Sequence, residues 1–216
     1  MKITGLSDYK GDTWEIQIDD GQKYFVNASV VEKFSLQKGQ EITGAELSEV
    51  ISSDILRKAK KRGMYLLGER DYCKAELTEK LTRTYNEEIA EEAVEYICSL
   101  GYINDGEYAR KLGDYLIKSK RFGVRRAKQE MLRRGLSAEL VENTLEDFSE
   151  EELDEELTAL IEKKYLNKIS DFDDRRRTVA ALVRRGFDFG SVRRCIEAVL
   201  NRHCEDFEEY EDDTDE

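Results

Sequence analysis

The stretch Lys118–Gly135 reads KSKRFGVRRAKQEMLRRG, and its composition and repetition decide the fold. Eight of its eighteen residues are Lys or Arg, and Glu130 is its one acidic residue. A shift of 51 residues brings the pattern back, with Arg125, Arg126, Arg133, Arg134, Gly135 and Leu136 falling on Arg176, Arg177, Arg184, Arg185, Gly186 and Phe187. Similarity of a chain to itself at a fixed period is typical of a repeat protein.

Apolar positions follow the same period. The aligned positions are Val94, Leu145 and Ile196, and also Ile97, Phe148 and Val199. Around them, apolar residues recur at helical spacing in three short segments per repeat. Gly135 and Gly186 are predicted helix ends that need a positive φ. The predicted fold is therefore mainly α, a tandem array of three three-helix repeats over residues 54–103, 104–148 and 149–201.

Residues 1–53 have a different pattern, which predicts a small N-terminal module with a β-hairpin and a helix. Thr13–Ile18 alternates apolar and polar side chains, Asp20-Gly21 is a hairpin signal, and Lys23–Val26 resumes the strand pattern. Ser52-Ser53-Asp54 is compatible with the end of one helix and the cap of the next, so the domain boundary is placed near residue 53. Helix caps are predicted at Thr43, Asn86, Asn104, Ser137 and Ser149.

Charge is segregated along the chain, although the net charge is −13. Residues 202–216 are predicted to form an acidic, disordered tail, because Glu205–Glu216 holds nine acidic residues and no basic one. Hydrophobic content of 39% beside 38% charged residues is typical of a soluble, charge-rich helical protein. No apolar run approaches the roughly 20 residues that span a bilayer, and the N-terminus lacks the apolar core of a signal peptide. We therefore expect a cytoplasmic monomer without a membrane partner.

Catalytic and cofactor motifs are missing from the sequence. The four cysteines form no CxxC pair, and the single histidine, His203, borders the acidic tail. No phosphate-binding loop, GxSxG or HExxH occurs. The sequence thus predicts a protein that is not an enzyme and that holds no metal and no cofactor.

Two basic ridges are the candidate binding surface. On the second helix of repeat two, Arg126, Gln129 and Arg133 are predicted to share a face, and Arg177, Ala181 and Arg184 are their counterparts in repeat three. The candidate partner-binding or DNA-binding residues are Lys118, Lys120, Arg121, Arg125, Arg126, Arg133, Arg134, Arg176, Arg177, Arg184 and Arg185. Matching ridges suit a periodic polyanion or a periodic acidic protein surface. The alternative is a solvated helix face with intrachain ion pairs. Repeat one has Lys74 and Arg83 in place of the arginine pairs and is predicted to be an exception.

Three passages carry a likeness to a known family. They are Tyr65–Leu77, Gly101–Asp105 with Tyr108-Ala109, and Gly123–Met131 with Gly135-Leu136. These passages resemble the RecX family of regulators of the RecA recombinase, and Phe34–Gly39 is similar to the β extension of its longer members. Val124 stands where the family usually has proline, and Cys73 where it usually has serine.

The resemblance implies a partner and a role. It implies tandem three-helix units that lie in the groove of the RecA filament on DNA and modulate, mostly inhibit, ATP hydrolysis, strand exchange and repressor cleavage in DNA repair and the SOS response. The ridges would then contact the acidic filament surface or the single-stranded DNA within it. Two alternatives stay open: a basic helical-repeat protein that binds single-stranded nucleic acid directly, and an adaptor that uses an apolar surface.

Overall fold

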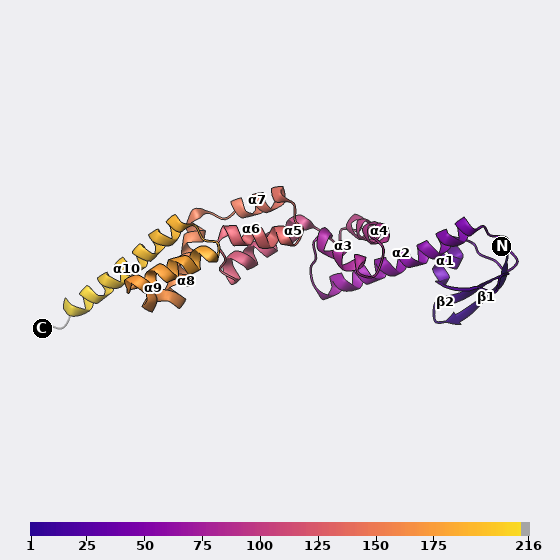
Figure 1. The fold of residues 1–216 in the computed structure, drawn as a ribbon, viewed down its shortest axis with the longest axis horizontal. Helices are drawn as coiled ribbons and strands as arrows, with labels where there is room; N and C mark the ends of the chain where they lie inside the picture. The colour runs from indigo at the N-terminus through magenta and orange to yellow at the C-terminus, as the bar shows by residue number, and fades with distance from the viewer. Residues whose placement is uncertain (213–216) are drawn as a thin grey trace. The chain divides into compact units, whose positions relative to one another are not determined.

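The computed structural model of the chain describes the backbone of residues 1–212 and the side chains of residues 1–202 (Figure 1). It has two units, which divide between Ile103 and Asn104, the residue at which the second repeat was predicted to begin. The mainly α fold with a small N-terminal sheet is confirmed. No helix in the described backbone is both long and apolar enough to cross a membrane.

Alternating side chains form the sheet of the first unit. β2 (Thr13–Ile18) pairs antiparallel with β3 (Lys23–Asn27), which confirms the predicted hairpin. A third strand, β1 (Ile3–Lys10), pairs with the other edge of β2, so the strand order is β1-β2-β3. The short helix α1 (Ala28–Lys33) contributes Val30 and Val31 to the core of this module.

The module and repeat one share the 26-residue helix α2 (Gly44–Glu69). Thr43 and Glu46 form the predicted capping box at its start. The helix does not end at Ser52-Ser53-Asp54, so the boundary placed near residue 53 falls inside it. Asp54 is only 2% exposed and caps no second helix, because its carboxylate accepts a hydrogen bond from the Asn27 amide instead.

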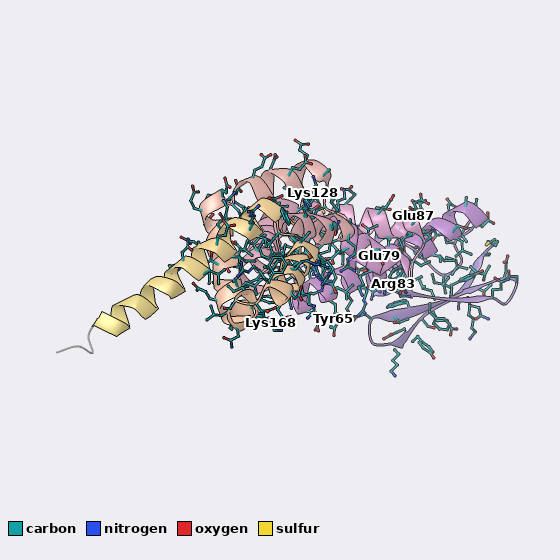
Figure 2. All side chains as sticks on the ribbon, turned by 60° about the vertical axis from the view of Figure 1, so that its left-hand side comes forward. Tyr65, Glu79, Arg83, Glu87, Lys128 and Lys168 are labelled. Carbon is teal, nitrogen blue, oxygen red and sulfur yellow. The ribbon has the colours of Figure 1, made fainter. Side chains whose placement is uncertain are left out.

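Two shorter helices complete repeat one. They are α3 (Lys74–Thr82) and α4 (Glu87–Ser99), and α4 begins at the predicted cap, Asn86. Val94 and Ile97 of α4 are fully buried in the core of the repeat, as their period predicted. Exposed positions of α3 carry an ion pair between Glu79 and Arg83, one turn apart (Figure 2).

The second unit holds repeats two and three. Its elements are α5 (Asp105–Asp114), the π-helical turn η1 (Tyr115–Ser119), α6 (Val124–Arg133), α7 (Ala138–Glu146), α8 (Glu150–Ile169), α9 (Phe172–Arg184) and α10 (Phe189–Asp212). Gly135 and Gly186 have φ of 85° and 95°, as predicted for helix ends. Tyr115, the first residue of η1, is 45% exposed. The wider π turn that starts there turns Leu116 and Ile117 into the core instead.

Three of the predicted helix caps and the described part of the predicted tail belong to this unit. Asn104, Ser137 and Ser149 each accept a backbone N–H at the start of their helix. α10 continues to Asp212, so the described backbone of the predicted tail is helical. Residues 213–216, and all side chains from His203 onward, lie outside the part of the chain that is described.

Candidate partner-binding surface

Two helices of the second unit carry equivalent rows of exposed side chains. On α6 the exposed positions include Arg125, Gln129 and Arg133, spaced i, i+4 and i+8. On α9, 51 residues later, Arg176, Ala180 and Arg184 are exposed at the same spacing. The buried faces carry Ala127 and Met131 on α6, and Thr178 and Leu182 on α9. We call the four arginines Arg125, Arg133, Arg176 and Arg184 the arginine stripes.

The stripes differ from the predicted ridge by one residue on α6. Arg126 was predicted to face outward, yet it is half-buried and its guanidinium lies 4.1 Å from the centroid of the Phe122 ring. Stacking on an aromatic face removes this cation from the outer surface. Its counterpart Arg177 is exposed and forms an ion pair with Asp174 at 2.9 Å.

The second arginine of each C-terminal pair is tied into the fold. Arg134 donates a hydrogen bond from Nη1 to the Tyr108 hydroxyl at 2.7 Å. Arg185, 51 residues on, donates to the backbone carbonyls of Lys120 and Arg121, at 2.6 Å and 3.2 Å. Because both arginines are half-buried and bonded inside the unit, they fix the positions of the helices.

The remaining predicted cations lie between α5 and α6. Lys118 forms an ion pair with Asp114 at 2.9 Å, and the hydrogen bond and negative charge of Asp114 raise the pKa of Lys118. Lys120 lies over the ring of Tyr115 at 5.3 Å from its centroid. Arg121 has a φ of 51° and pairs with Glu156 at 3.3 Å. Lys118 and Lys120 are exposed, whereas Arg121 is half-buried.

The two stripes adjoin where the carboxyl end of α9 meets the amino end of α6. The Gly123 amide donates to the Arg185 carbonyl at 3.0 Å, and the Arg125 amide donates to the Gly186 carbonyl at 3.2 Å. Gly123 is the N-cap of α6 and has no side chain to cap it, so carbonyls from the end of α9 satisfy these amides. The negative end of one helix dipole thus faces the positive end of the other.

Intrachain ion pairs occupy only part of the stripes. Arg133 pairs with Glu130 at 2.7 Å, and Arg125 approaches Asp188 at 3.8 Å. Arg176 and Arg184 make no ion pair with any side chain that the structure describes. Exposed pairs contribute at most about 1 kcal/mol, so the paired arginines can exchange partners readily.

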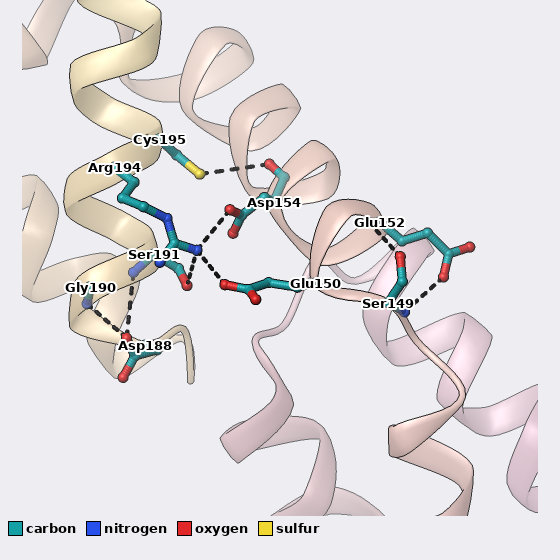
Figure 3. A network of polar contacts seen from close by, with 9 residues as sticks. All are labelled: Ser149, Glu150, Glu152, Asp154, Asp188, Gly190, Ser191, Arg194 and Cys195. Atoms are coloured by element: carbon teal, nitrogen blue, oxygen red, sulfur yellow. Dashed lines mark hydrogen bonds and ion pairs between the residues drawn. The ribbon is translucent and has the colours of Figure 1, made fainter.

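Other arginines near the stripes are neutralised by acidic neighbours, and Figure 3 shows the clearest case. Arg194 of α10 contacts Glu150 at 2.7 Å and Asp154 at 3.0 Å, and bonding to Asp154 is the main reason that its pKa is raised (Figure 3). At the start of α10, hydrogen bonds from the Gly190 and Ser191 amides lower the pKa of Asp188. This network therefore stabilises the packing of α8 and α10.

Among the residues whose side chains are described, no group of three or more His, Cys, Asp or Glu is placed to hold a metal ion. Cys195 is buried, and this burial raises the pKa of its thiol. His203 and Cys204 lie outside the described side chains.

A third set of cations does not follow the 51-residue period and was not predicted as a binding surface. It lies on α2, in repeat one, and consists of Arg57, Lys58, Lys60, Lys61 and Arg62. A simple signal marks it, because no acidic residue occurs between Ile55 and Gly68. Repeat one thus has a basic surface on its first helix, where repeats two and three have theirs on the second.

Comparison with known proteins extends this picture. The family model described as RecX, third three-helix domain, matches residues 150–196. The regulatory protein RecX of Clostridioides difficile strain 630 is 25% identical over 214 residues, which cover 97% of this chain and 98% of that one. The regulatory protein RecX of Listeria welshimeri is 28% identical over 192 residues, 87% of this chain and 71% of the relative.

Solved structures share the fold. A crystal structure of regulatory protein RecX matches with a TM-score of 0.70 and 20% identity, over 88% of this chain and 96% of the other. RecX from Lactobacillus salivarius matches with a TM-score of 0.62 and 19% identity, over 68% and 97%. The domain match, the relatives that align over most of the chain and the shared fold agree with the three passages described above, and the chain is similar to RecX regulatory proteins over most of its length.

Proposed function

We propose that this protein binds the filament that the RecA recombinase forms on DNA and regulates it, mostly by inhibiting ATP hydrolysis, strand exchange and repressor cleavage. Similarity to relatives named regulatory protein RecX over most of the chain supports the regulatory role. The filament is proposed as the partner because it is periodic and carries both acidic protein surface and phosphates. The protein itself carries out no chemistry in this scheme.

The observation that carries the proposal is the pair of equivalent arginine stripes on successive repeats. Arg125 and Arg133 of α6 are exposed at positions that Arg176 and Arg184 repeat on α9. A helical-repeat protein can meet one unit of a periodic partner with each repeat. Like charges gathered on one surface repel each other, and an acidic partner offsets that cost.

The test is charge reversal on α9, where the stripe arginines make no ion pair within the described part of the chain. Arg176→Glu with Arg184→Glu is expected to raise the concentration needed for half-inhibition of the filament ATPase by about tenfold or more, since arginines at interfaces often contribute above 1 kcal/mol each. Thermal unfolding should not change, because both side chains are exposed.

The matched control reverses two exposed lysines of α8. Lys163→Glu with Lys164→Glu alters the net charge equally, away from the stripes, and should leave inhibition intact. Inhibition that is unaffected by the α9 substitutions would refute a role for the stripes. If the α9 and α8 double variants weaken inhibition equally, inhibition depends only on the net charge of the protein.

A further inference from the structure

The exposed face of α2 carries cations that the proposed function does not use. Five lie between Arg57 and Arg62, and no acidic residue interrupts Ile55–Gly68. α2 belongs to the first unit, whereas the arginine stripes belong to the second. This face therefore needs its own explanation.

Two of the five cations already have a structural role. Arg57 and Lys58 pair with the buried carboxylate of Asp54 at 3.1 Å and 2.7 Å. A third, Lys60, is half-buried and lies 3.9 Å from the centroid of the Tyr96 ring. Lys61 and Arg62 are exposed and form no ion pair with any residue in the described part of the chain. Lys58 also keeps 54% of its side chain exposed.

An exposed aromatic ring lies among these cations. Tyr65, labelled in Figure 2, is 58% exposed and follows Lys61 by four residues and Arg62 by three. The guanidinium carbon of Arg62 is 5.2 Å from the centroid of the Tyr65 ring. At about 100° per residue, Lys58, Lys61, Arg62 and Tyr65 fall within one arc of the helix. The opposite arc holds the fully buried Ala59 and the buried Gly63.

We propose that this face of α2, formed by Lys58, Lys61, Arg62 and Tyr65, binds single-stranded nucleic acid. The cations would neutralise phosphates, and an unpaired base would stack on the exposed ring of Tyr65, the combination by which proteins bind single strands without reading their sequence. An acidic protein surface would also pair with the cations, but its carboxylates would not stack on the exposed ring of Tyr65. The inference does not depend on the proposed function, because the residues lie in the other unit.

The experiment measures binding of the full chain to a fluorescent single-stranded oligothymidylate, without recombinase, by fluorescence anisotropy over a range of salt concentrations. Lys61→Glu with Arg62→Glu is expected to weaken binding at least tenfold at low salt. It should also reduce the slope of log affinity against log salt by about 1.4, since each neutralised phosphate on a single strand contributes about 0.7.

Substitutions at the ring separate stacking from charge. Tyr65→Ala is expected to weaken binding by roughly five- to a hundredfold, the range found when stacking aromatics are removed. Tyr65→Phe keeps the ring and should bind like the unaltered chain. An effect of Tyr65→Ala no larger than that of Tyr65→Phe would overturn the proposed stacking.

Two controls test where the strand binds and what the face prefers. Lys163→Glu with Lys164→Glu makes the same change in net charge on α8 and should have little effect, whereas a loss equal to that of the α2 variant would overturn the proposal. Polyglutamate should compete weakly with the oligonucleotide. If polyglutamate instead binds as tightly and with the same dependence on Lys61 and Arg62, the face recognises acidic protein and the proposal fails.

Discussion

Replacement of Gly123 by alanine should break the junction that brings the two arginine stripes together. A Cβ atom at position 123 would lie 2.1 Å from the carbonyl carbon of Gly186 and 2.2 Å from the amide nitrogen of Phe187. Real Cβ atoms do not approach other atoms so closely, and the atoms in the way belong to the backbone. The amino end of α6 and the turn after α9 must therefore move apart.

The size of the effect follows from the bonds that cross this junction. Separation forfeits the hydrogen bonds from the Gly123 amide to the Arg185 carbonyl and from the Arg125 amide to the Gly186 carbonyl. Two such bonds contribute about 2 kcal/mol, and leaving the amide of the buried Gly123 without an acceptor raises the cost to about 4 kcal/mol. At roughly 4 °C per kcal/mol for a unit of about 100 residues, the Tm of the second unit should fall by about 8 to 16 °C.

Calorimetry gives the Tm, and hydrogen exchange locates the change. Exchange of the Arg125 amide should accelerate in Gly123→Ala, because that amide loses its acceptor. Gly68→Ala is the control, since a Cβ there meets nothing within 4 Å and alanine in a helix is favoured by about 1 kcal/mol. An unchanged Tm together with unchanged exchange at Arg125 would refute the close approach of the two helix ends.

Two further predictions concern single polar side chains. Burial alone would raise the pKa of Asp54, but hydrogen bonds from Lys58, the Asn27 amide and Arg57 hold it below its ordinary value. The stabilising contribution of the ionised Asp54 is therefore complete above about pH 4 and is lost as the pH falls through the lowered pKa. Urea titrations should show that the free energy of unfolding falls less below pH 4 in Asp54→Asn than in the unaltered chain. Ser149→Ala removes half of a capping box and should cost about 1 kcal/mol in the same titrations, and an equal cost for Ser170→Ala would contradict the assignment.

Features fixed by neighbours in sequence were predictable. The caps at Thr43, Asn86 and Ser149 depend on residues at most three positions away, so short patterns identify them. The positive φ of Gly135 and Gly186 follows from the end of an apolar helical pattern.

Features fixed by distant residues were not predictable. Ser52-Ser53-Asp54 resembles a helix boundary, and only the Asn27 amide, 27 positions away, shows why Asp54 is buried inside one long helix. The contact between Gly123 and Gly186 joins residues of different repeats, so no local pattern reveals it. The basic face of α2 escaped notice for another reason: it lies on a different helix of its repeat and has no counterpart 51 residues later.

The arginine pairs explain why a repeated sequence does not translate directly into a repeated binding surface. Neighbouring residues on a helix point about 100° apart, so the two members of a pair seldom face the same partner. In the pairs at the ends of α6 and α9, Arg133 and Arg184 face outward, while Arg134 and Arg185 bond within the unit. Substitution of an inward member would move the helices that position the outward one. Loss of activity on replacing Arg185 therefore cannot identify a contact with the partner, whereas loss on replacing Arg184 in a chain of unchanged stability can.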